Sequence, residues 1–501
     1  MLRFAVYDDH GPATQWPLVN AHLVGPEDMP LRGEITFEAG VITCRKRGIQ
    51  PAALSLQYDA GPMGTLMLQT CLLPDREKPY MLSIELARHR IKMFIAKSEE
   101  WQMFDLSAEH PAMQLWEEAR QLSSDAWISK DVIAADKAAR QSLIHAIDAS
   151  ERLALAHAEI LLHRRFGQKP AASSTLGVRI WPGRDGQPLR DLVKKEFDLL
   201  VVPLNWKHLE VKEGIYRWEP VDRWMEWAVK QGKPIVAGPL LDFSARAMPE
   251  WMSVWQHDYD TCRDMAYDHV EKLVERYHAS VNVWNIASGL NTNEHFTFTA
   301  DQMLDLTRMT VLCVRQRRKN ARAMIELRQP FGEHCAFNRD SLHPLAFMDR
   351  LIQEGVRLDA VGVQLLFGHH THGRATRDLM QISSMLDRFF LLEIPILLSA
   401  LGVPSEEIDP QGGWWREPWS PQQQTKWISR LFAIGLSKPF VESMFWADLF
   451  DHPHAELPKS GLISDSGHPK PGLQRLMHLR RHLRKPLGPL KLPSKSQRLE
   501  A

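Results

Sequence analysis

The sequence has few cysteines, few tyrosines and no long apolar run. Its five cysteines are scattered and form no C-x-x-C pair, which argues against a cysteine-based zinc site or a disulfide framework. No segment approaches the roughly 20 apolar residues of a membrane-spanning helix. Residues 1–9 lack the apolar stretch of a signal peptide. We therefore expect a cytoplasmic protein with free thiols and no cofactor.

An excess of charge of either sign is also missing. The 501 residues include 61 basic and 61 acidic side chains, so the formal net charge is zero. This balance argues against a nucleic-acid or membrane partner. The length is sufficient for two or three domains. Tryptophan is abundant, with 17 residues against 7 tyrosines. Indole faces suit stacking on sugars, although most of these side chains are expected in the core.

Residues 1–108 are predicted to form a β-sandwich-like domain, because short apolar segments alternate there with Gly, Pro and Asp turns. The turn at 38–40 predicts a hairpin between two of these segments. The expected strands are Ile35–Phe37, Val41–Cys44, Ala53–Tyr58, Leu66–Leu73, Met81–Ala87 and Ile91–Ala96. Such domains often bind sugars, but the fold alone does not establish this function.

Residues 109–170 are predicted to form a helical hairpin. The expected helices are Met113–Ile128 and Val132–Phe166, and the second carries one apolar stripe at three- and four-residue steps. The hairpin is either a connector packed on the next domain or a surface for homo-oligomer formation. At the other end of the chain, residues 483–501 are basic and rich in proline. They are expected to be a solvated tail or a docking tail.

Residues 171–482 alternate short apolar strands with amphipathic helices, which predicts an α/β fold of the (β/α)8 TIM-barrel type. The expected strands are Val178–Trp181, Leu199–Leu204, Ile235–Ala237, Val281–Ile286, Ala323–Glu326, Ala360–Gln364, Ile396–Ser399 and Val441–Trp446.

Short motifs in this region resemble those of glycoside hydrolase family 10. Residues 205–218, N-W-K-H-L-E-V-K-E-G-I-Y-R-W, are similar to the family's K-W-x-x-x-E-P-x-x-G-x-F-x-F. Further similar motifs follow in the family's order, at 232–241, 249–251, 283–289, 358–364, 396–402 and 461–471. The resemblance implies a TIM barrel, a xylanase-like hydrolase activity and a β-linked glycan or oligosaccharide as partner.

The residues that carry out the family's chemistry are missing. A retaining glycosidase uses two carboxyl groups about 5–5.5 Å apart, one as nucleophile and one as acid/base. The resemblance places the acid/base at Gly289 and the nucleophile at Ala400, and neither side chain can attack or transfer a proton. Positions that contact sugar in the family are replaced as well, at Pro203, Asn205, Pro239, Phe243, Ser244 and Leu366.

Substitute groups remain near the expected ends of the strands. Glu326, Asp242 and Glu294 are candidate catalytic carboxylates, because barrel active sites lie at the carboxyl ends of the strands. Alternatively, Glu326 forms a buried ion pair with Arg328 or with another arginine. The candidate substrate-binding residues are Asn205, Trp206, Gln364, Trp446 and Trp415.

Two loops carry further candidate groups. His369, His370 and His372 are suited to zinc or nickel if Asp242, Glu326 or Asp448 converges on them, but a polar loop without metal is the expectation. The aromatic loop 412–419 is a sugar platform, a partner surface or a lid clamped onto the barrel.

Three functions remain open at this point. The first is a glycan-binding or structural pseudoenzyme related to glycoside hydrolase family 10. The second is an active O-glycosyl hydrolase that uses the substitute carboxylates. The third is an intracellular scaffold for protein interactions.

Overall fold

A closed barrel of eight parallel strands forms the larger part of the computed structural model, which describes residues 1–172 and 174–488. The strands close in the order β10-β13-β14-β15-β16-β17-β19-β9. Their bounds are β9 (Leu176–Arg179), β10 (Leu199–Val202), β13 (Ile235–Ala237), β14 (Val283–Ser288), β15 (Arg322–Leu327), β16 (Ala360–Leu366), β17 (Ile396–Gly402) and β19 (Val441–Trp446). The predicted barrel and all eight of its strands are confirmed.

The barrel interior is packed rather than hollow. One layer consists of inward-facing apolar side chains from seven of the eight strands. The eighth strand, β9, has Gly177 at this level, next to the Phe445 ring. A Cβ atom at Gly177 would lie 2.3 Å from that ring, so the absence of a side chain lets Phe445 fill the centre. The strands are buried on both faces, which explains why they appear in the sequence as nearly continuous apolar runs.

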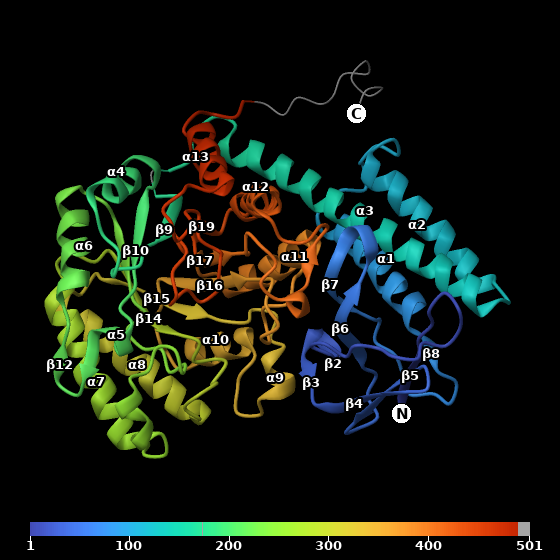
Figure 1. Ribbon diagram of the computed structural model, residues 1–501, viewed down its shortest axis with the longest axis horizontal. Coiled ribbons are helices and arrows are strands. Elements are labelled where there is room, and N and C mark those ends of the chain that lie inside the picture. The colour runs from blue at the N-terminus through green and yellow to red at the C-terminus, as the bar shows by residue number, and fades with distance from the viewer. Residues whose placement is uncertain (173, 489–501) are drawn as a thin grey trace.

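Helices surround the barrel and follow the strands along the chain (Figure 1). They are α4 (Gln187–Glu196), α6 (Glu219–Lys230), α7 (Tyr259–Tyr277), α8 (Ala300–Arg317), α10 (Pro344–Gln353), α11 (Leu379–Phe389), α12 (Pro421–Ser437) and α13 (Pro471–Leu483). The connections also contain short elements, namely α5 (Trp206–Leu209), α9 (His334–Phe337) and the hairpin β11 (Glu210–Lys212) and β12 (Ile215–Tyr216). In the described part of the chain, no helix is both long and apolar enough to cross a membrane.

Two sheets lie beside the barrel and confirm the predicted N-terminal sheet domain. One contains β4 (Gly33–Glu38), β5 (Val41–Lys46), β1 (Leu2–Ala5) and β8 (Tyr80–Met81), in that order. The other contains β18 (Trp414–Trp415), β7 (Gly64–Gln69), β6 (Ala53–Asp59), β2 (His22–Val24) and β3 (Pro30–Leu31).

The strands predicted at Met81–Ala87 and Ile91–Ala96 are wrong. Apart from Met81, which ends β8, both segments belong to helix α1 (Leu82–Glu100), whose buried face includes Leu82, Leu86, Arg90 and Phe94. These residues recur every four positions, which is the spacing of one helix face. The charged residues between the apolar ones imitated the alternation of a strand over short windows.

The predicted helical hairpin is confirmed as α2 (Pro111–Ile128) and α3 (Val132–Phe166). Helix α3 runs from the N-terminal sheets to the barrel and packs along α12 and α11 (Figure 1). The beginning of the predicted tail pairs with the end of α3, since the backbone N–H groups of Leu487 and Gly488 donate to Phe166 and Gly167. Residues 489–501 of that tail lie outside the described residues.

A barrel loop joins the N-terminal sheet. Strand β18 follows β17 in the chain and pairs with β7, with Trp414 opposite Thr65 and Trp415 opposite Gly64. Trp415 and Trp419 are each only 4% exposed, so the loop 412–419 is clamped against the protein and is not an exposed sugar platform.

The buried carboxylate of Glu151 on α3 holds this junction together. It accepts hydrogen bonds from Trp415 Nε1 at 2.6 Å, from Arg416 Nη2 at 2.7 Å and from the backbone N–H of Leu379 at 3.2 Å. One side chain therefore connects α3, β18 and the start of α11.

We predict that Glu151→Ala destabilises the whole protein by about 2–4 kcal/mol, because it leaves the buried N–H groups of Trp415 and Leu379 without an acceptor, whereas Arg416 keeps its bond to Asp148. The measurement is guanidinium-induced unfolding followed by circular dichroism. Glu159→Ala is the matched control, since Glu159 is exposed on the same helix. Equal stability of the two variants would contradict this role of Glu151.

Candidate functional site

A cavity of about 530 Å³ opens at the carboxyl end of the barrel strands, and we call it the mouth cavity. Active sites of TIM barrels lie at this end. The polar and aromatic side chains that line it come from the carboxyl ends of β9 and β15 and from the loops after β9, β10, β13, β14, β15, β16 and β19. They include Arg179, Trp181, Asn205, Trp206, Asp242, Arg246, Glu294, Glu326, Arg328, Arg374, Asp448, His452 and Glu456.

Glu456 is the central acceptor of the mouth cavity. Its carboxylate accepts hydrogen bonds from Arg374 Nη2 at 2.7 Å and Gln364 Nε2 at 3.1 Å. Arg179 and Arg328 each approach it to 3.8 Å. Burial alone would raise the pKa of Glu456, but the surrounding arginines hold it far below its usual range. Glu456 is therefore ionised at all ordinary pH values and is unsuited to donating a proton.

The predicted ion pair between Glu326 and Arg328 is replaced by two other interactions. Arg328 binds both oxygens of Asp242, with Nη1 at 3.2 Å and Nη2 at 2.6 Å. Glu326 instead accepts a hydrogen bond of 2.6 Å from Ser288 Oγ. The bidentate pair is possible because the loop after β13 brings Asp242 beside the Arg328 guanidinium. The two residues lie far apart in the sequence, so the sequence alone did not predict this contact.

The two positions that the resemblance assigns to catalytic carboxylates are occupied by other groups. Gly289 has φ +70°, and a Cβ atom there would lie 2.8 Å from Arg328 Cδ. The Arg328 side chain therefore fills the space that a side chain at 289 would need. Ala400 is fully buried in an apolar cluster with Leu366, Ala447 and Leu457. A carboxylate at either position would displace these neighbours.

The three candidate substitute carboxylates all line the mouth cavity, so the structure brings them to one site. Each has a partner. Asp242 is bound by Arg328, Glu326 by Ser288 and Glu294 by Gln329 Nε2 at 2.8 Å. Asp448 is likewise engaged, by Arg179 at 3.5 Å and by His452 at 3.2 Å.

The five predicted substrate-binding residues are divided between the cavity and the core. Asn205 and Trp206 line the mouth cavity. Gln364 lies beneath it, bonded to Glu456, while the fully buried Trp446 donates to the carbonyl of Ser460. Trp415 lies at the N-terminal junction and not at the cavity.

Trp181 is a cavity residue that sequence reasoning missed as a binding group. Its indole stacks on the His452 ring with centroids 5.0 Å apart and planes 4° apart. Its position just after the first barrel strand was the sequence feature that could have identified it as a cavity residue.

The surviving motif at 205–218 has a structural role. Glu210 accepts hydrogen bonds from Trp206 Nε1 at 2.6 Å, Tyr216 Oη at 2.7 Å and the Gly214 backbone N–H at 2.8 Å. Burial by itself would raise the pKa of Glu210, but hydrogen bonds from His269 and these groups lower it to about 2. The motif thus locks the β11–β12 hairpin and fixes Trp206 in the cavity wall.

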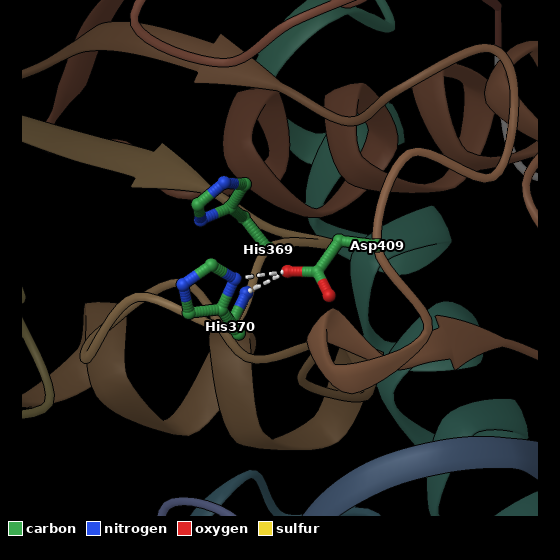
Figure 2. A group of neighbouring side chains, drawn as sticks. All are labelled: His369, His370 and Asp409. Carbon is green, nitrogen blue, oxygen red and sulfur yellow. Dashed lines mark hydrogen bonds and ion pairs between the residues drawn. The ribbon is translucent and has the colours of Figure 1, made fainter.

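The three histidines of the loop after β16 do not line the mouth cavity, although Arg374 of the same loop does. His369 and His370 lie beside Asp409, from the loop after β17 (Figure 2). The predicted helpers Asp242, Glu326 and Asp448 line the cavity instead, so their convergence on the histidines is not observed. His372 turns away and pairs with Asn20 Oδ1 at 3.0 Å.

The fold and the site define a (β/α)8 barrel protein with a polar cavity at the carboxyl end of its strands. Residues 171–316 match the model of glycosyl hydrolase family 10, and the barrel is accordingly family-10-like. No curated protein sequence matches the chain.

Several solved structures are similar to this chain. Native xylanase 10B from Thermotoga maritima is 14% identical, with 62% of this chain and 95% of that chain covered and a TM-score of 0.48. Xylanase B from Clostridium stercorarium F9 is 15% identical, with coverages of 64% and 98% and a TM-score of 0.46. The family 10 protein from Paenibacillus barcinonensis is 17% identical, with coverages of 64% and 97% and a TM-score of 0.46.

Glu210 generates a prediction about pH. Its folded pKa of about 2 lies below the ordinary value of 4.5, so its contribution to stability is complete above pH 4.5 and is lost as the pH falls towards 2. We expect Glu210→Gln to cost on the order of 2–3 kcal/mol at pH 7 and much less at pH 3. Urea unfolding at both pH values, followed by tryptophan fluorescence, measures this difference.

Glu213→Gln is the control, because Glu213 is exposed in the same hairpin. If the destabilisation by Glu210→Gln is the same at pH 3 and pH 7, the carboxylate of Glu210 does not have the assigned role.

Proposed function

We propose that the mouth cavity binds a β-linked, xylan-like saccharide and does not cleave it by the double-displacement mechanism of family 10. The observation that carries this proposal is the filling of both catalytic positions, by Arg328 beside Gly289 and by the apolar cluster around Ala400, while the cavity itself stays open. A site of this kind retains binding surface without a nucleophile.

The lining groups are suited to sugar. Trp181 offers a partly exposed indole, and the arginines supply donors in fixed directions because carboxylates hold them. Arg246 is exposed at the rim, and its side chain donates to the carbonyl of His454 at 3.4 Å. Hydroxyl-rich ligands match such a set of donors, and a carboxylate on the sugar would find a charged partner in Arg246.

We expect Trp181→Ala to raise the Kd for xylohexaose about tenfold, because it removes the stacking surface. Isothermal titration calorimetry measures the change. Trp255→Ala is the control, since Trp255 is exposed outside the mouth cavity and should leave the Kd unchanged. Absence of xylohexaose binding to the unmodified protein would overturn the proposal.

We expect the unmodified protein to release no reducing sugar from xylan or from an aryl β-xyloside. The alternative function is an active O-glycosyl hydrolase with Glu326 as a catalytic group, which is favoured by the position of Glu326 in the cavity wall. Hydrolysis that Glu326→Gln abolishes would establish this alternative, whereas hydrolysis that Glu326→Gln leaves intact would exclude Glu326.

The third function, an intracellular interaction scaffold, stays a prediction, as does a homo-oligomer through residues 109–167. Trp127 and Ile128 at the tip of α2 are 54% and 78% exposed and are the apolar groups that such a contact would use. Light scattering measures the molar mass, and a dimer that Ile128→Asp converts to a monomer would support assembly through this tip.

A further inference from the structure

A cluster of metal-ligating side chains lies outside the mouth cavity. His369 and His370 come from the loop after β16, and Asp409 comes from the loop after β17. One nitrogen of each imidazole and one carboxylate oxygen lie within 4.8 Å of one another. The two rings stack with centroids 4.5 Å apart, and both lie on the same side of Asp409 (Figure 2).

We propose that His369, His370 and Asp409 bind one divalent transition-metal ion of the zinc or nickel type. Imidazole and carboxylate are ligands that these ions prefer, with bonds of about 2.0–2.2 Å. Donor atoms of one such ion lie roughly 3.3–3.6 Å apart in a tetrahedral arrangement. The ligand atoms lie within 4.8 Å of one another, so side-chain rotation must bring them closer when the ion binds.

The ligands are oriented by neighbouring groups. Asp409 accepts hydrogen bonds from the backbone N–H of His370 at 2.6 Å and of Gln411 at 3.1 Å. His369 Nδ1 contacts Thr371 Oγ1 at 2.7 Å and accepts from the Thr371 backbone N–H at 3.2 Å, so an ion at Nε2 requires the ring proton to move to Nδ1, where Thr371 Oγ1 would accept it. Partners of this kind fix ligand direction and strengthen metal binding. At present His370 Nδ1 bonds Asp409 Oδ2 at 2.6 Å, and the ion would replace that bond.

The site is accessible and the third histidine does not belong to it. The His370 side chain is 58% exposed and that of Asp409 14%, so water can complete the coordination. His372 stacks on Phe337 with centroids 3.9 Å apart and bonds Asn20, which holds it away. A site with three protein ligands leaves one position open to water, unlike the four-ligand structural zinc sites.

Metal binding would stabilise a loop that also serves the mouth cavity. Arg374 lies in the same loop as the two histidines and binds Glu456 at 2.7 Å. An ion that joins the loops after β16 and β17 would hold Arg374 in place. The proposal nevertheless depends on His369, His370 and Asp409 alone and stands whether or not the cavity binds sugar.

The test uses the full chain after treatment with EDTA and dialysis, titrated with ZnSO₄ or NiCl₂ by calorimetry. We expect one equivalent of ion to bind to the unmodified protein at least tenfold more tightly than to His370→Ala or Asp409→Asn. His257→Ala is the matched control, because His257 is exposed and lies outside the cluster. It should retain the binding.

Thermal unfolding supplies a second measurement. Zinc should raise the Tm of the unmodified protein and of His257→Ala but not that of Asp409→Asn, because an ion stabilises only the folded state that binds it. Far-ultraviolet circular dichroism checks that each variant is folded. Equal binding by the unmodified protein and both cluster variants would show weak binding to surface histidines only and would overturn the proposal.

Discussion

The charged contacts of Arg328 determine the character of the barrel mouth. Its guanidinium binds both oxygens of Asp242 and approaches Glu456, and its stem fills the space beside Gly289. Buried charges are stable only when partners surround them, so Arg328, Asp242 and Glu456 require one another. The same side chain therefore stabilises the cavity and excludes a carboxylate from the position where the family resemblance expects the acid/base.

The positions that resemble family 10 and those that depart from it differ in their physical role. Glu210 accepts hydrogen bonds from Trp206, Tyr216 and Gly214 and holds the hairpin in place, so replacing Glu210 would leave these buried donors without an acceptor. At the two departing positions, neighbouring side chains pack directly against Gly289 and Ala400. The family-10-like framework of the barrel therefore does not require a carboxylate at position 289 or 400.

The N-terminal sheets and the barrel share one segment of chain. Strand β18 belongs to a barrel loop by sequence and to the N-terminal sheet by pairing, and Glu151 binds it from α3. The loops after β16 and β17 are thus held from both sides, which places His370 and Asp409 next to each other. The proposed metal site and Arg374 in the mouth cavity therefore share the loop after β16.

The sequence by itself determined the elements whose signal is local. Eight apolar strands with intervening helices, the long helix Val132–Phe166 and the ordered motifs of the barrel were all predictable, because periodicity and turns act over a few residues. Helix α1 was misassigned, since its charged residues imitated strand alternation.

The candidate site depended on contacts between distant segments. Asp242, Glu294 and Glu326 were predictable as cavity residues from their places near the ends of strands. Glu456 carried no motif, and its arginine partners come from the end of β9 and from the loops after β15 and β16. The burial of Trp415, Trp446 and Gln364 and the pairing of Arg328 with Asp242 were likewise decided only by the tertiary structure. The physical reason is that burial and ion pairing depend on which loops meet in space, and the local sequence does not encode that.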